Sequence, residues 1–103
     1  NASALLRLFE RCDAIRKPLR FEEALFACEC DARGRLGFED RAYPQRARLS
    51  TALQTVLDVK TGPIAGAAAK RGLKGEAIGA AVADARREAL REWLAAEEVE
   101  QQP

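Results

Sequence analysis

The sequence predicts an all-α protein of about five helices. Apolar residues recur at a helical spacing in every periodic segment, and Pro and Gly lie at the expected helix ends. No pair of alternating segments is joined by a hairpin turn. The composition of the 103 residues, 48% apolar and 32% charged with seven Gly and four Pro, is typical of a globular helical protein.

Two helices are predicted on either side of Pro18. Ser3 is a candidate cap for the first helix, and Pro18 is expected to end it because a residue before proline is pushed out of the helical region. The expected apolar face of the first helix is formed by Leu5, Leu8, Phe9, Cys12 and Ile15. The expected apolar face of the second helix, which ends at Gly34, is formed by Phe21, Ala24, Leu25, Cys28 and Ala32.

Three further helices follow a loop predicted over residues 34–44. Pro44 fits the first position of the third helix, and Thr61-Gly62-Pro63 begins a short alanine-rich helix with Gly72 as a left-handed cap. The third apolar face is formed by Leu49, Leu53, Val56 and Leu57. The last helix is expected to span about 23 residues, or roughly 35 Å. Its apolar stripe is formed by Ile78, Val82, Ala85, Ala89 and Trp93.

The composition also restricts the classes of site. Three cysteines, Cys12, Cys28 and Cys30, are a poor disulfide framework, and the chain has no histidine to complete a zinc site. We expect these cysteines to be reduced, as in a cytoplasmic protein. No apolar run approaches the roughly 20 residues of a membrane span, so we expect no membrane partner. The chain lacks methionine and begins with Asn1. We therefore expect a fragment of a longer protein, with residues 1–3 as the remnant of an expression tag.

Charge is distributed unevenly along the chain. Residues 1–31 carry five Arg and Lys against six Asp and Glu, which gives −1. Residues 32–75 carry nine against three, which gives +6, and residues 76–103 carry three against seven, which gives −4. A basic middle region suits a phosphate backbone, whereas the acidic end would repel one. We therefore expect any nucleic-acid contact to be local.

Two groups of cations are candidate phosphate sites. Lys70, Arg71, Lys74 and Gly75 precede the last helix, where exposed backbone N–H groups attract anions. The second group, in the loop and at the start of the third helix, is Arg33, Arg35, Arg41, Arg46 and Arg48. Arginine forks suit phosphate oxygens, but they also tie loops down through carboxylates and carbonyls. For the arginines, phosphate binding and a structural role both stay open. For the first group, the alternative is an ordinary turn between two helices with no ligand.

An ordered set of motifs resembles a known family. The motifs are the stretch Ala27–Glu39 (ACECDARGRLGFE), the step Tyr43-Pro44-Gln45, and the block Gly72–Gly79 (GLKGEAIG) followed by Arg86 and Arg87. Together they resemble the C-terminal part of bacterial CCA-adding enzymes, the HD-domain-containing tRNA nucleotidyltransferases. The resemblance covers residues 4–93. It implies that residues 4–40 are the end of an HD-type helical domain and residues 41–103 a helical tail, which can pack together as one unit.

The resemblance also implies function. Such enzymes add C, C and A to the 3′ end of tRNA from CTP and ATP with magnesium, and their HD site can hold a second divalent metal. Asp31 occupies the place of a late HD-domain acid, so it is the candidate metal ligand in the whole protein; its alternative is a helix-end acid paired with Arg33 or Arg35. Glu29 is expected to pair with an arginine. Here the nucleotide-binding head is absent, so we expect no cofactor and no catalysis, and a role in binding tRNA through the cations named above.

Two other functions remain as alternatives. The chain can be the remnant of an HD phosphohydrolase, a phosphatase or 2′,3′-cyclic phosphodiesterase, with Asp31 as its remaining ligand. It can also be a non-catalytic interaction module, in which the stripe that contains Trp93 docks a partner helix. Trp93 itself is expected to pack in the core or on a partner surface rather than on a base.

Overall fold

The computed structural model describes residues 1–35, 37 and 39–101. The helices among them are α1 (Ala2–Arg11), α2 (Pro18–Arg33), α3 (Pro44–Leu57), α4 (Thr61–Lys70) and α5 (Glu76–Gln101). No strand occurs in this described part of the chain, so the all-α prediction is confirmed. Within the same residues, every helix is too short or too polar to cross a membrane.

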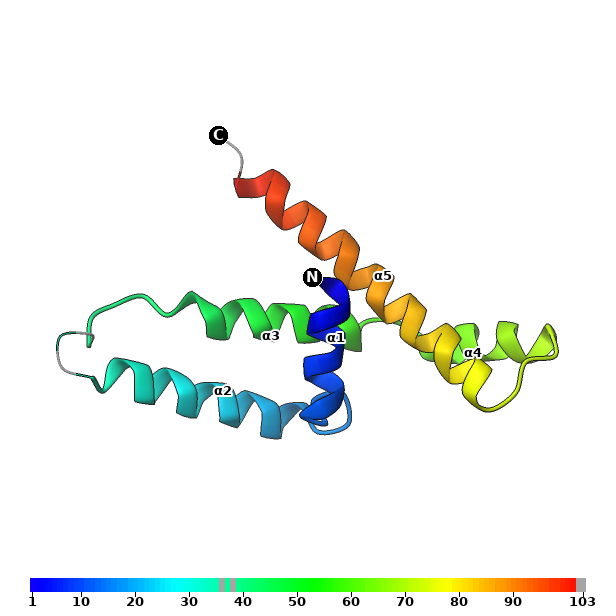
Figure 1. The fold of residues 1–103 in the computed structure, drawn as a ribbon, viewed down its shortest axis with the longest axis horizontal. Coiled ribbons are helices and arrows are strands. Elements are labelled where there is room, and N and C mark those ends of the chain that lie inside the picture. Colours follow the sequence, from blue (N-terminus) through cyan, green and yellow to red (C-terminus); the bar gives the residue numbers. More distant parts are fainter. Residues whose placement is uncertain (36, 38, 102–103) are drawn as a thin grey trace.

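The helices form an elongated, flat assembly of 58 × 35 × 18 Å (Figure 1). α2 and α3 lie side by side at one end, α4 packs on the first part of α5 at the other end, and α1 lies near the middle. α5 also contacts α1 and α3, so it joins the two ends. The radius of gyration of 16.6 Å exceeds the roughly 13 Å of a spherical domain of this size. The two ends are therefore far apart in space.

The core lies where α1, α2, α3 and α5 meet. Its largest fully buried side chains are Phe9, Leu6, Leu53, Leu90 and Val56. The rings of Phe9 and Phe21 are perpendicular, with centroids 5.6 Å apart, an arrangement that favours an aromatic pair. Trp93 is partly buried against this cluster, as expected for core packing. This one cluster therefore fixes how the two ends are oriented.

The predicted end of the first helix is wrong. α1 ends at Arg11, and Asp13 follows with a positive φ of 55°. The Ala14 N–H donates to the Phe9 carbonyl at 2.8 Å and the Asp13 N–H donates to the Glu10 carbonyl at 3.2 Å. These two bonds form a Schellman cap, in which an aspartate takes the left-handed position that glycine usually fills. Pro18 begins α2 instead of ending α1.

The predicted apolar face of α1 is also partly wrong. Leu6 and Phe9 are buried, whereas Leu8 is 37% exposed and Cys12 is exposed. Because the helix ends before Cys12, its short buried face is set by the contact with α5 and not by the longer stripe of the sequence. In α5 the fully buried residue is Leu90, which the predicted stripe did not include.

The first three residues belong to the fold. The Asn1 side chain accepts a hydrogen bond from the Ala4 N–H at 2.8 Å, so Asn1, and not Ser3, caps α1. Ala2 is only 5% exposed in the core. Asn1 and Ala2 therefore help to form α1 and the core, and the origin of residues 1–3 as a tag remnant stays a prediction.

The turn between α4 and α5 follows the sequence prediction closely. Gly72 has a φ of +86°, its N–H donates to the Ala69 carbonyl, and the Leu73 N–H donates to the Ala68 carbonyl. This is a Schellman cap with glycine in the left-handed position. Pro44 at the first turn of α3 is likewise confirmed.

Gly72→Ala is expected to lower the free energy of unfolding by about 1–2 kcal/mol, because an L side chain is strained at this φ. Gly66→Ala is the matched control: Gly66 lies inside α4, and an added Cβ meets nothing within 4 Å. We expect this control to raise the free energy of unfolding by about 0.5–1 kcal/mol. Urea unfolding followed by circular dichroism measures both, and two shifts of the same sign would contradict the assigned cap.

Candidate nucleic-acid interface

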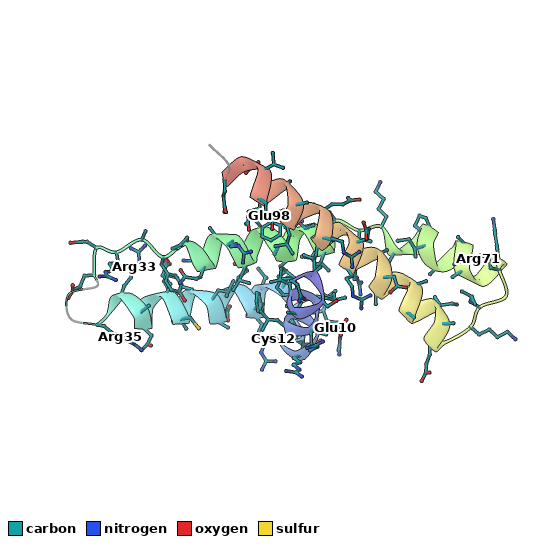
Figure 2. The ribbon with its side chains drawn as sticks, turned by 45° about the horizontal axis from the view of Figure 1, so that its top comes forward. Glu10, Cys12, Arg33, Arg35, Arg71 and Glu98 are labelled. Carbon is teal, nitrogen blue, oxygen red and sulfur yellow. The ribbon has the colours of Figure 1, made fainter. Side chains whose placement is uncertain are left out.

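A hollow lined by arginines lies where the loop joins α2 to α3. It has a volume of about 280 Å³ and is lined by Ala32, Arg33, Arg35, Arg41, Ala42, Tyr43 and Gln45. We call this set the arginine hollow. Arg33 is the last residue of α2 and Arg35 follows it (Figure 2), while the other polar side chains come from the far side of the loop and the start of α3. Among the described residues that line this hollow there are therefore three cations and no carboxylate.

Glu29 lies on α2 one turn before Arg33, and its carboxylate binds two arginines near the hollow. Its carboxylate accepts a hydrogen bond from Arg46 at 3.0 Å and forms a longer ion pair with Arg33 at 3.6 Å. The Glu29 side chain is only 17% exposed. The prediction that Glu29 pairs with an arginine is confirmed. Because Arg46 takes the short bond, the Arg33 guanidinium keeps donors available for a ligand.

Asp31 lies on the surface beside this hollow. Its side chain is 81% exposed, and it forms an ion pair with Arg35 at 3.9 Å, as the alternative interpretation expected. Around Asp31, the described residues bring together no three potential metal ligands. One exposed carboxylate does not fit a divalent ion, which needs several ligands. A role for Asp31 as a ligand in the whole protein stays a prediction.

Arg46 and Arg48 already have partners within the chain. The Arg46 guanidinium lies 4.8 Å from the centre of the Phe26 ring, in addition to its bond to Glu29. Arg48 donates to both carboxylate oxygens of Glu97 at 2.9–3.1 Å and lies 5.4 Å from the centre of the Trp93 ring. The pair joins α3 to the end of α5. RNA binding by these two arginines stays a prediction, but they would have to leave these contacts.

The second cationic group lies at the turn between α4 and α5. We call Lys70, Arg71, Lys74 and Gly75 the basic turn. All four residues are exposed. Lys70 ends α4, Arg71 follows it, and Gly75 precedes α5, with carbonyls of Lys74 and Gly75 accepting the first bonds of that helix. Across the described part of the chain, no ion pair or side-chain hydrogen bond engages these cations.

The two cationic groups lie at opposite ends of the molecule. Figure 2 shows Arg33 and Arg35 at one end of the long axis and Arg71 at the other. The long dimension is 58 Å. The acidic residues Glu88 and Glu92 belong to α5, which follows both groups in the sequence. The structure thus places the two cation groups named from the sequence at separate sites; the distance between them is what the sequence did not indicate.

Sequence reasoning also missed part of the hollow. Tyr43 and Gln45 were noted only as a motif and not as candidate binding residues. The available signal was an aromatic residue close to several arginines, a combination that is common where proteins bind single-stranded nucleic acid.

Comparison with known proteins connects the chain to one group. It is 58% identical over 94 residues to a multifunctional CCA protein of Acidovorax sp. (strain JS42), an alignment that covers 91% of this chain and 22% of the relative. The corresponding protein of Variovorax paradoxus (strain S110) is 60% identical over 89 residues, an alignment that covers 86% of this chain and 21% of that relative. The multifunctional CCA protein of Ralstonia nicotianae (strain ATCC BAA-1114 / GMI1000) is 62% identical over 65 residues, which is 63% of this chain and 15% of that relative.

No model of a known protein family matches the chain. No solved structure matches it either. The chain spans less than a quarter of the length of the three curated relatives described above. Identities of this size over most of the chain nevertheless establish common ancestry, and the chain is homologous to a segment of the multifunctional CCA proteins.

Proposed function

We propose that this chain is the part of a cytoplasmic CCA tRNA nucleotidyltransferase that binds the body of tRNA. The arginine hollow is the observation that carries this proposal. Its described lining has three guanidinium groups and no carboxylate, which is a setting for phosphate oxygens. The names of the relatives support the same substrate, because CCA is the sequence at the 3′ end of tRNA.

The basic turn gives the same proposal a second contact. Its three cations are exposed, and they stand at the far end of the long axis from the hollow. A ligand that meets both sites must extend over much of the molecule, as a folded RNA does and a mononucleotide does not. Binding at two separated points fixes orientation as well as position, and a fixed orientation turns delivery of the RNA terminus into an intramolecular step.

Catalysis belongs to another part of the proposed enzyme. This chain has no histidine, and its described residues bring together no three carboxylate or thiol groups that fit a metal ion. We therefore place CTP, ATP and the magnesium that their transfer requires outside this chain. What these residues contribute is affinity and orientation for tRNA, and not proton transfer or phosphoryl transfer.

Removing the cations of the hollow tests the proposal. We define the hollow variant as Arg33→Gln, Arg35→Gln and Arg41→Gln together. If the three guanidinium groups contact phosphates, tRNA affinity falls and the slope of log affinity against log salt decreases by about 2–3, since each contact contributes roughly 0.7–0.9. Fluorescence anisotropy of labelled tRNA at several salt concentrations measures both quantities.

A matched control removes the same charge elsewhere. Arg11→Gln, Arg16→Gln and Lys17→Gln together change exposed residues at the turn between α1 and α2, away from both cationic sites. We expect a much smaller change in slope for this control. Equal losses for the two variants would show that only net charge matters, and an unchanged affinity of the hollow variant would refute the proposal.

A further inference from the structure

We propose that the arginine hollow binds one unstacked nucleotide of the RNA, with the phosphate on its guanidinium groups and the base against Tyr43. This inference rests on the proposed function, because it assumes that the chain binds tRNA. It goes further by naming the feature that is recognised: a nucleotide turned out of a helix, and not the backbone of a paired arm.

The shape of the site supports an unstacked base. The phosphates of a duplex lie on its outer ridges and can bind to exposed side chains without entering a cavity. The basic turn is such a surface, since all its residues are exposed. Most residues that line the arginine hollow are exposed too, but they surround a partly open hollow of about 280 Å³, just below the usual range of small-ligand pockets, which is space for one base rather than several.

The lining supplies a distinct contact for each part of a nucleotide. The guanidinium groups of Arg33 and Arg35 make only long ion pairs, at 3.6 and 3.9 Å, and neither takes part in a hydrogen bond among the described residues. Their donors can therefore serve a phosphate. The Tyr43 ring offers a stacking face, and the Gln45 amide offers both a donor and an acceptor for the edge of a base.

Tyr43 is also held in place by its backbone. It lies directly before Pro44, at the cap position of α3, with φ −127° and ψ 77°. A residue before proline has few backbone conformations, so the ring is carried on a constrained position and not on a free loop tip. Its side chain makes no capping hydrogen bond. The ring therefore has no role in capping α3 and is available as a wall of the hollow.

The experiment compares Tyr43→Leu with Tyr43→Phe in the 103-residue chain. The probes are tRNA, a short single-stranded RNA and a blunt RNA duplex. We expect Tyr43→Leu to weaken binding of the first two by about tenfold, with little change in salt slope, because stacking on an aromatic ring is lost and no charge is removed. Duplex binding is expected to stay unchanged, and Tyr43→Phe is expected to behave as the original chain.

A direct readout comes from the ring itself, since Tyr43 is the only tyrosine. On addition of the single-stranded RNA, its ring proton resonances should shift in a nuclear magnetic resonance spectrum. They should not shift with the duplex. This measurement uses the unchanged chain, so it decides the question even if Tyr43→Leu fails to fold by circular dichroism.

The outcomes separate the two proposals. If the hollow variant loses tRNA affinity while Tyr43→Leu does not and the ring protons do not shift, the nucleotide pocket is refuted and tRNA binding stands. Equal losses of duplex and single-stranded binding on Tyr43→Leu also refute the pocket. If the hollow variant binds tRNA like the original chain, the proposed function fails and the pocket fails with it.

Discussion

Phe9→Ala is expected to lower the free energy of unfolding by about 3–5 kcal/mol. Phe9 has no exposed surface and its ring meets Phe21 edge-on in the core shared by α1, α2, α3 and α5. The change leaves a cavity that a short helix cannot close, since α1 is held at its end by the Phe9 carbonyl in its Schellman cap. A loss of this size approaches the whole stability of a typical domain.

Leu8→Ala on the same helix is the control for this prediction. Leu8 is 37% exposed, so removing its side chain loses little buried area and leaves no closed cavity. We expect a cost of about 1 kcal/mol or less. Urea unfolding followed by circular dichroism compares the two variants. Similar costs would show that α1 is not anchored through Phe9.

The ends of the elements show what local pattern can predict and what it cannot. Gly72 was assigned correctly to the left-handed cap because glycine alone adopts that conformation without strain. Asp13 adopts the same region at the end of α1 and was missed, because aspartate is compatible with helix, cap and turn alike. The stripe through Cys12 then extended the helix past its real end. The local sequence is compatible with helix, cap or turn at Asp13, and contacts between the helices determine which of these forms.

The same distinction applies to the candidate site. The pairs Arg33–Glu29 and Arg35–Asp31 are four residues apart on or near one helix, so their spacing predicts them. The pairs of Arg46 with Glu29 and of Arg48 with Glu97 join different helices, across 17 and 49 positions. No sequence spacing indicates such pairs. Which arginines keep free donors was therefore predictable only once α2, α3 and α5 were placed.

The core and the two cationic sites are connected through α5. This helix packs on α4 beside the basic turn, on α1 in the core, and on α3, which begins next to the arginine hollow. The Arg48–Glu97 pair ties its last part to α3. The spacing between the two cationic sites is thus set by packed helices and not by a flexible linker. A rigid spacing is what binding one RNA at two points requires.

Removing both cationic sites together is expected to abolish most salt-dependent tRNA binding. We define the turn variant as Lys70→Gln, Arg71→Gln and Lys74→Gln together, which removes three exposed cations. If every one of the six cations contacts a phosphate, the combined variant loses about 4–5 from the slope of log affinity against log salt. Anisotropy titrations of tRNA with each variant and the combined variant measure the slopes.

The way in which the losses combine tests whether one RNA meets both sites. The two groups lie far apart, so their direct effects on the fold should be independent. With one bound RNA, the slope losses of the hollow and turn variants add, and each single variant already weakens binding of the same complex. If only one group contacts the RNA, its variant accounts for the whole loss and the other changes nothing. If one RNA meets both sites, intact tRNA should lose affinity in both variants. An RNA cut to a length that reaches only one end should lose affinity in only one of them.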